Sequence, residues 1–516
     1  MTIVNRKNIS TSGFDEDALT TSTPGEQIIN FGDLTTTGDL SNGIFASAND
    51  VTIRNFGAVE TSGAGAAGIF AEGANAHVEN FGAVHTTGGF FGNQEFFSEG
   101  IFVEGDGFYI ANHGSISVEG ALSSTMVGRG DHGIIINYGS VDSASQDGEV
   151  MAVHGDASRI INYGHVNSVS SGGVMSAIGE EAQVINYGSV DSAGSNCIIM
   201  NAVGDAAQAT NAGQITGSGQ NETGMRVQGE HASAINRGDI LMTGAGDAAM
   251  LGTLGNTDLA NWGKILIDAD GSIGMGTFGD GDKVSNFGLI ETHGDGADGV
   301  LMFGNGAHFT NGGRISTNGG GANGVAVIGD DAVVENDHTG VIESKNAAST
   351  AVELNLLEGS GTHAEVDNFG LIWGESVAIK GGAGQETVIN HGQIFGDVVL
   401  GDGNDTFVFG KGGSLTGDLF LGGGDDLVYI EKNSGSMSVA DFAAGSASGD
   451  VINISAFYSN FADLIAHSHQ VDNNTVIDLG HNDHLVLADV KLSALDAGDF
   501  QFKPSLLGSY MASSPV

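Results

Sequence analysis

The chain has 516 residues, including 86 Gly, 3 Pro and 1 Cys, and its 63 Asp and Glu against 16 Lys and Arg give a formal net charge of −47. This acidity excludes nucleic acid as a partner, because a phosphate backbone requires clustered cations. The single cysteine, Cys197, excludes an internal disulfide framework and a cysteine-based zinc site.

Residues 1–27 are expected to form an N-terminal cap. They contain no apolar segment like that of a Sec-type signal peptide, and no stretch of the chain reaches the roughly 18 consecutive apolar residues of a membrane-spanning helix. We therefore expect no membrane span. If the protein is secreted, we expect it to use a route other than the Sec pathway.

Residues 28–380 are dominated by an internal repeat. The pentamer Asn-x-Gly-x-(Val/Ile/Leu) recurs mostly every 25 residues, and Asn336 occupies one further position with an extra residue in its turn. Two coils carry a seven-residue insertion. The other repeat asparagines are Asn30, Asn55, Asn80, Asn112, Asn137, Asn162, Asn186, Asn211, Asn236, Asn261, Asn286, Asn311, Asn368 and Asn390.

Each repeat is predicted to hold three short strands. Apolar and small residues alternate with a period of two, as in VTIRN (51–55), and glycines interrupt the runs. A coil of about 25 residues suits an all-β, right-handed parallel β-helix, in which each coil covers the apolar face of its neighbour. The handedness is an expectation from known β-helices. The repeat asparagines should form a buried ladder of side-chain hydrogen bonds, with an Asn-lined ligand track as the alternative.

Aromatic residues follow many of the repeat asparagines and should form a second column. We expect these rings to stack on one another, with sugar binding as the alternative. A separate insertion, the Phe90–Phe97 loop, contains four Phe residues and is either a docking patch or a plug. The aromatic column consists of Phe31, Phe56, Phe81, Tyr138, Tyr163, Tyr187, Trp262, Phe287 and Phe369.

In residues 381–432 the turn of the repeat contains an acidic residue at its sixth position. The sixth turn position is Gln208, Lys283 or His308 in the central coils and becomes an acid in three successive later turns, at Glu386, Asp405 and Asp426. Copies 19 and 21 residues apart should lie directly above one another. Stacked carboxylates need a neutralising cation, and carboxylate and glycine carbonyl oxygens suit Ca²⁺ better than Mg²⁺.

These three turns resemble a known family. GGAGQETVI, LGDGNDTFV and LGGGDDLVY are similar to the GGxGxDxUx nonapeptide of RTX (hemolysin-type) calcium-binding proteins. The resemblance implies a short calcium-binding β-roll in which Ca²⁺ lies between stacked turns. The implied metal ligands are Asp405, Asp426, Gly401, Gly403, Gly422, Gly424 and, as a departure from the motif's Asp, Glu386.

Residues 433–516 are expected to form a C-terminal cap. Segments such as VADFAAGSASGDVINISAF (439–457) are similar to the capping and export region of type I secreted proteins. This resemblance implies an uncleaved signal read by a type I exporter. The four histidines of this region, His467, His469, His481 and His484, are expected to be solvated rather than to bind a transition metal.

Taken together, the sequence predicts a secreted calcium-binding repeat protein that acts as an extracellular structural or adhesive module. Its partner would be a cell-surface glycan, a matrix or another copy of the chain. The alternative is a polysaccharide-active enzyme of the lyase or C5-epimerase type, since such enzymes use β-helices. We do not expect catalysis, because the cations of the repeat are isolated and no paired-carboxylate or Asp-His-Arg cluster stands out.

Overall fold

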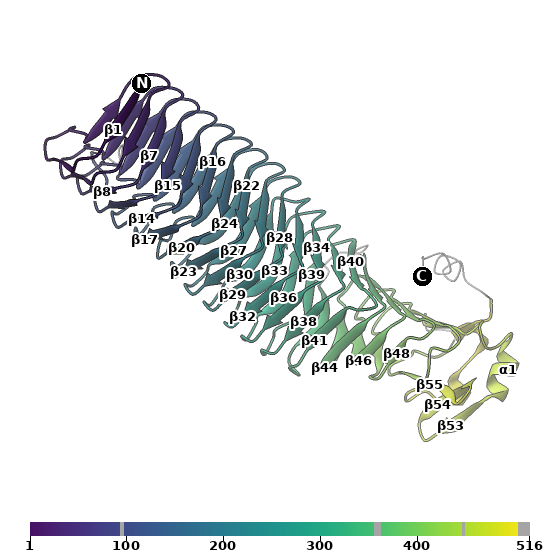
Figure 1. Ribbon diagram of the computed structural model, residues 1–516. Helices are drawn as coiled ribbons and strands as arrows, with labels where there is room; N and C mark the ends of the chain where they lie inside the picture. The colour runs from purple at the N-terminus through teal and green to yellow at the C-terminus, as the bar shows by residue number, and fades with distance from the viewer. Residues whose placement is uncertain (93–96, 356–362, 446–448, 504–516) are drawn as a thin grey trace. The chain divides into compact units, whose positions relative to one another are not determined.

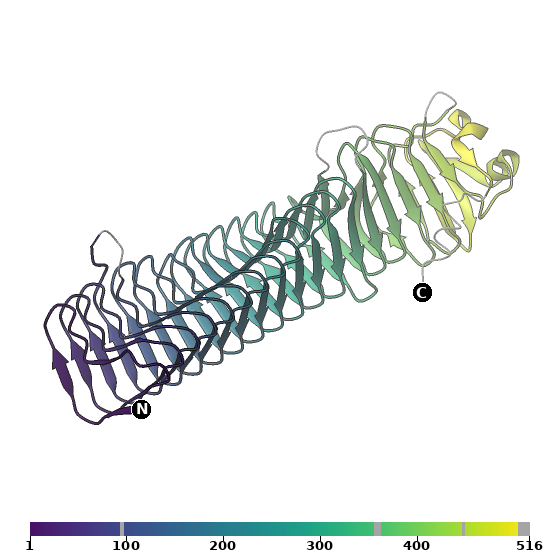
Figure 2. The ribbon, with the colours of Figure 1, turned by 90° about the horizontal axis from the view of Figure 1, so that it is seen from above.

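The chain is an all-β parallel solenoid with coils of about 25 residues, as predicted. The structure, a computed structural model, describes residues 1–92, 97–355, 363–445 and 449–503. It divides into two compact units, Met1–Gly276 and Thr277–Val516. Within each unit, the corresponding strands of successive coils lie side by side (Figures 1 and 2).

One coil of the first unit shows how the sequence determines the fold. Its three strands are β7 (Thr52–Asn55), β8 (Ala58–Thr61) and β9 (Ile69–Glu72). Inward side chains such as Ile53, Val59 and Ile69 are fully buried, and their neighbours in sequence face outward. The alternation with a period of two therefore builds a continuous apolar interior as the coils stack.

In most coils the first strand ends at the repeat asparagine, and in the two coils after Asn390 it ends at Phe409 and Ile430, which continue the same register. In the first unit these strands are β1 (Thr2–Asn5), β4 (Gln27–Asn30), β7, β10 (His77–Asn80), β13 (Tyr109–Asn112), β16 (Ile134–Asn137), β19 (Arg159–Asn162), β22 (Gln183–Asn186), β25 (Gln208–Asn211), β28 (Ser233–Asn236) and β31 (Asp258–Asn261). In the second unit they are β34 (Lys283–Asn286), β37 (His308–Asn311), β40 (Ala332–Asn336), β43 (His363–Asn368), β45 (Gln385–Asn390), β47 (Thr406–Phe409), β50 (Leu427–Ile430), β52 (Val451–Asn453) and β56 (Phe500–Gln501).

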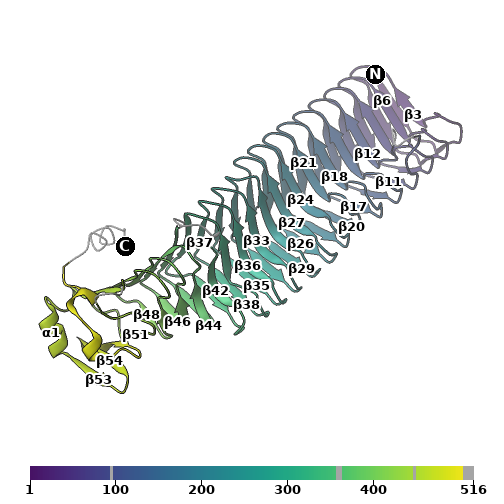
Figure 3. The ribbon, with the colours of Figure 1, turned by 180° about the vertical axis from the view of Figure 1, so that it is seen from behind.

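The other strands of the coils stack in the same parallel manner. Figure 3 shows members of the third-strand column of the first unit, such as β12 (Ile101–Glu104) and the neighbouring strands β18 (Met151–His154) and β21 (Met175–Ile178). Pairing is in register, for example Met151 with Met175, so equivalent side chains lie above one another.

The asparagine column forms the predicted ladder. Asn137 Nδ2 donates to Asn162 Oδ1 at 2.9 Å, and Asn162 Nδ2 donates to Asn186 Oδ1 at 2.9 Å. These amides are fully buried. Because each buried amide is satisfied by the next, the structural interpretation of the repeat asparagines is confirmed.

The N-terminal segment, expected as a cap, has the strands of a further coil. β1 pairs in register with β4, and Asn5 Nδ2 donates to Asn30 Oδ1 at 2.8 Å. The segment has Lys7 at the position where the later pentamers have glycine.

The parallel ladder continues beyond residue 432, into the segment that was expected to form a cap. β52 pairs with β50, and β56 pairs with β52. An antiparallel meander of β53 (Ser468–Val471), β54 (Asn474–Gly480) and β55 (Asp483–Leu487) follows the short helix α1 (Phe461–Ala466). β55 joins the solenoid by parallel pairing with β51 (Met437–Val439). The last part of the expected export region, residues 504–516, lies outside the described residues.

Candidate functional site

The predicted acidic residues form one buried column in the second unit. Glu386 lies in β45, while Asp405 and Asp426 immediately precede β47 and β50. Thr387 pairs with Thr406, and Thr406 pairs with Leu427, so the three acids occupy equivalent positions in successive coils. Their side chains are only 1–2% exposed.

Each acid is connected to the next through the backbone. Glu386 N donates to Asp405 Oδ1, and Asp405 N donates to Asp426 Oδ1, both at 2.8 Å. The second carboxyl oxygens, Glu386 Oε2, Asp405 Oδ2 and Asp426 Oδ2, are buried and accept no hydrogen bond from any described residue. Buried carboxyl oxygens normally have a partner, so these three atoms have unused hydrogen-bonding capacity among the described residues.

Burial makes ionisation of these acids unfavourable. It raises the pKa of Asp405 to about 8, and the adjacent Glu386 carboxyl adds to the effect. It also raises the pKa of Asp426 to about 7, with a further contribution from the charge of Asp450. The pKa of Glu386 is raised by burial as well. A bound cation would oppose these shifts by stabilising the ionised carboxylates.

The predicted glycines bring the turn backbones into close contact. Gly403 and Gly424 have φ of +154° and +143°. A Cβ on Gly403 would lie 1.7 Å from Gly384 O, and a Cβ on Gly424 would lie 1.4 Å from Gly403 O. Gly401 and Gly422, with φ of +110° and +94°, are similarly confined. Only glycine allows the turn backbones to stack this closely.

The sequence alignment of the turn was wrong by one residue. It placed Lys283 and His308 in the column of Glu386. The structure instead pairs Glu386 with Ala364, and Ala364 with Ala332. Lys283 and His308 pair with each other in the adjacent, outward-facing column. A shift of one residue in a strand changes the face of every side chain, so the acids replace small interior residues rather than exposed polar ones.

The structure adds one acid that the motif search missed. Asp450 precedes β52 and is 3% exposed. Its Oδ1 accepts a hydrogen bond from Asp426 N at 3.3 Å, and its Oδ2 accepts one from Ala443 N at 2.8 Å. The column therefore extends one coil beyond Asp426. Its sequence signal is an acid directly after Gly449 and before the apolar run VIN, without the preceding glycines of the nonapeptide.

The aromatic column stacks as expected. In the first unit, Phe31, Phe56 and Phe81 stack in succession with ring centroids 5.0 and 4.8 Å apart. Tyr138, Tyr163 and Tyr187 do the same at 5.2 and 5.0 Å. Within each run the ring faces are covered by neighbouring rings and the edges are exposed, which disfavours sugar binding along the stack because a sugar stacks on a ring face.

The Phe90–Phe97 loop is only partly described, because residues 93–96 lie outside the described ranges. Phe91 lies against Phe14, with ring centroids 5.9 Å apart, while Phe90 is 42% exposed.

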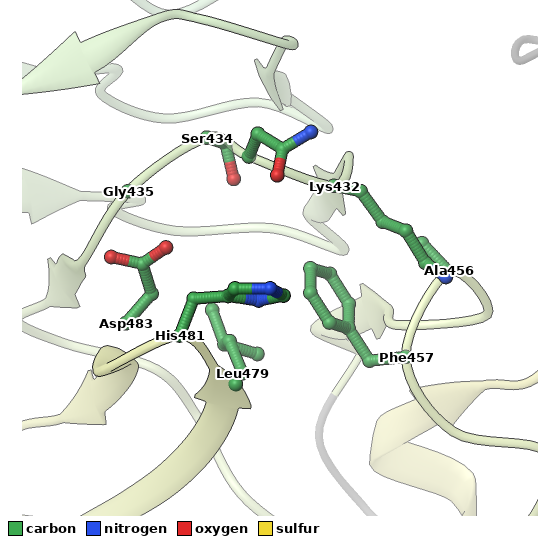
Figure 4. A pocket seen from close by; sticks show the side chains of 10 residues that line it. Lys432, Ser434, Gly435, Ala456, Phe457, Leu479, His481 and Asp483 are labelled. Carbon is green, nitrogen blue, oxygen red and sulfur yellow. The ribbon is translucent and has the colours of Figure 1, made fainter.

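A small pocket lies beside the C-terminal meander of the second unit. It encloses about 250 Å³ and is lined by Lys432, Ser434, Phe457, His481 and Asp483, among others. Figure 4 shows the His481 ring extending across the pocket toward Phe457. Of the four histidines singled out in the sequence, His481 lines this pocket and His467 accompanies Asp463, with Nδ1 3.6 Å from Oδ1.

Within the described ranges, no three or more His, Cys, Asp or Glu side chains converge as a ready-made metal cluster. The acids of the column follow one another from coil to coil instead.

No helix in the described part of the chain is long and apolar enough to cross a membrane. In comparisons with known proteins, no family model matches the chain and no curated protein matches its sequence.

Proposed function

We propose that the protein is a calcium-binding repeat protein whose acidic column couples Ca²⁺ binding to the stability of the second unit. The observation that carries the proposal is the buried column of Glu386, Asp405 and Asp426, in which each acid has one carboxyl oxygen without a hydrogen-bond partner among the described residues. Burying like carboxylates without a cation is costly, and hard oxygen ligands favour Ca²⁺.

The residues fit a calcium ion chemically. Asp405 and Asp426 would supply carboxylate oxygens, with Glu386 and Asp450 as further acids of the same column. Gly401, Gly403, Gly422 and Gly424 would supply carbonyl oxygens from the turns. When bound, calcium supplies positive charge and no redox or acid–base chemistry. The role of the site is therefore structural.

The wider proposal is that the chain is secreted and that its solenoid serves as an extracellular structural or adhesive module. Support comes from the similarity of residues 433–516 to the export region of type I secreted proteins and from the net charge of −47. Self-repulsion keeps such a chain expanded where calcium is scarce. Calcium binding outside the cell would then favour folding.

Calorimetric titration of the full chain with CaCl₂ tests the binding site. We expect heat of binding for the wild type and its loss in the double variant Asp405→Asn, Asp426→Asn. A matched control is Asp131→Asn, Asp156→Asn, which changes two exposed turn acids whose Oδ1 atoms also accept a backbone hydrogen bond from an adjacent coil. Equal calcium binding by both double variants would refute the assignment.

Export is tested separately by expressing the full chain in cells with and without a type I exporter. Exporter-dependent appearance in the medium, lost on deletion of residues 433–516, would support secretion. Retention of the full chain in both strains would contradict it.

A further inference from the structure

The exposed aromatic column of the first unit is interrupted by two successive positions without a ring. Its stacked members have ring centroids 4.6–5.2 Å apart and interplanar angles of 4–12°. The next two positions are Ala212 and Arg237. The stacked rings are those of Phe31, Phe56, Phe81, His113, Tyr138, Tyr163 and Tyr187.

The backbone is regular at this position. Ala212 N donates to Asn186 O at 2.7 Å, and Arg237 N donates to Asn211 O at 2.7 Å. Tyr187 N makes the same bond to Asn162 O at the same distance. The coils therefore keep their spacing, and only a side chain is missing. We call the space over Ala212, between Tyr187 and Arg237, the Ala212 gap.

The two walls of the gap belong to Tyr187 and Arg237, the column neighbours of Ala212. Tyr187 stays parallel to Tyr163, with an interplanar angle of 10°, so its second face is turned toward Ala212. Arg237 is exposed, and its guanidinium has no hydrogen bond, ion pair or ring contact with any described residue. Two coil spacings are about 10 Å, so a ring at the centre would lie about 5 Å from each wall.

The chain itself shows that these contacts are favourable. At the start of the same column, the guanidinium of Arg6 lies over the Phe31 ring at 4.7 Å from its centroid. An arginine in this column therefore stacks on a ring one coil away. In the second unit, the column position Gly312 also lacks a side chain, but there the Phe287 ring lies over it, 2.9 Å from where a Cβ would be.

We propose that the Ala212 gap is a binding site for a planar aromatic ring, inserted edge-on from solvent between Tyr187 and Arg237. An aromatic ring can stack on tyrosine with one face and attract the guanidinium with the other. A pyranose ring has no π face for the cation, so it uses only one wall. The ring can belong to a free small molecule or to an aromatic side chain of a polypeptide, because both present the same chemistry.

The test is ligand-observed saturation-transfer NMR on the full chain with p-cresol, the side-chain analogue of tyrosine, as the probe. A single stacked ring should bind in the millimolar range. Ala212→Phe fills the gap from within and should abolish the signal, whereas Ala212→Ser leaves the gap open and should retain it. Arg237→Ala should weaken binding about threefold. Circular dichroism confirms that each variant is folded.

Two further probes sharpen the result. 4-Methylcyclohexanol has a similar size and no π system, so it should bind more weakly than p-cresol. The peptide Gly-Tyr-Gly-amide distinguishes the source of the ring: tighter binding than p-cresol indicates a polypeptide ligand, and weaker binding indicates a small aromatic molecule. The proposal is overturned if p-cresol gives no signal with the wild type, or if Ala212→Phe binds it equally well.

Discussion

Buried acids also occur in the first unit, where Glu222 and Asp247 lie inside neighbouring coils and are each 1% exposed. Glu222 N donates to Asp247 Oδ1 at 2.8 Å, and Ser192 Oγ donates to Glu222 Oε1 at 2.6 Å. Burial, together with the charge of Glu222, raises the pKa of Asp247 to about 6. Hydrogen bonds thus satisfy these carboxyls without removing the cost of ionising them.

This raised pKa predicts that the first unit loses stability as the pH rises. The unfolded chain ionises Asp247 near its ordinary pKa of 3.8, whereas the folded chain does so only at about 6. The contribution is therefore fully present below pH 4 and lost as the pH rises through 6, by about 2–3 kcal/mol. Urea unfolding at pH 4, 5, 6 and 7 should show a shallower pH dependence for Asp247→Asn than for the wild type. Parallel curves for the two proteins would contradict this reasoning.

The asparagine ladder makes a second prediction for single residues. Asn186 accepts from Asn162 Nδ2 at 2.9 Å and donates to Asn211 Oδ1 at 2.8 Å. Asn186→Ala removes two hydrogen bonds of the buried ladder, one from Asn162 Nδ2 and one to Asn211 Oδ1, which should cost about 1–3 kcal/mol of unfolding free energy. Asn167→Ala is the control, because Asn167 is exposed and its amide lies 3.5 Å from Asp142. Equal losses in urea unfolding would show that the ladder adds little.

At the scale of the strand and turn, glycine residues determine how closely successive turns can stack. Gly424→Ala should be strongly destabilising, because its φ is +143° and its Cβ would lie 1.4 Å from Gly403 O. We expect a loss of about 2–4 kcal/mol, combining backbone strain with overpacking. Gly412→Ala is matched in having a φ of +85°, but nothing lies within 4 Å of its Cβ, so it should cost only about 1 kcal/mol. Thermal melts of both variants in the presence of a chelator separate the steric clash from any effect on metal binding. If Gly424→Ala and Gly412→Ala had similar melting temperatures, the predicted clash at Gly424 would be contradicted.

The coil architecture could be predicted because stacking imposes the same constraint on every repeat. The spacing of the asparagines gave the coil length, and the alternation with a period of two gave the strands. The acid column was found for the same reason: Glu386, Asp405 and Asp426 recur at a fixed place relative to the glycines of the turn.

The register of that column could not be obtained from the turn glycines alone. Turn glycines mark where the chain bends, whereas the face of a side chain depends on its position in the following strand. Aligning Glu386 with His308 satisfied the glycines and missed the inward face, which only the pairing with Ala364 defines. Asp450 was missed because its turn keeps the acid and one glycine without the rest of the motif.

The first coil was missed for a different physical reason. From the second coil onward, the pentamer glycine is required because its Cβ would meet the carbonyl oxygen of the coil before it, as Gly32 would meet Lys7 O at 2.1 Å. At the equivalent position of the first described coil, Lys7 is exposed and its side chain is accommodated. A pattern that requires the glycine therefore misses this coil.

At the scale of the whole chain, stability is the sum of contributions from neighbouring coils, as in other solenoids. Metal binding at one column then stabilises its own coils and those stacked on them. The buried acid column of Glu386, Asp405, Asp426 and Asp450 belongs to Thr277–Val516. If that column is the calcium site, calcium should act locally, and Met1–Gly276 provides an internal reference in the same molecule.

Hydrogen exchange of the full chain, followed by mass spectrometry, can measure this locality. In calcium, peptides covering 381–432 should be protected, and adding a chelator should increase their exchange at least about tenfold, since saturating ligand contributes RT ln(1 + [L]/Kd) to local stability. Peptides from 182–276 should change little. The variant Asp405→Asn, Asp426→Asn should respond to calcium no more than those reference peptides do. A uniform response of both units to the chelator would instead indicate calcium bound loosely by the overall negative charge, and no response in 381–432 would remove the coupling between metal and fold.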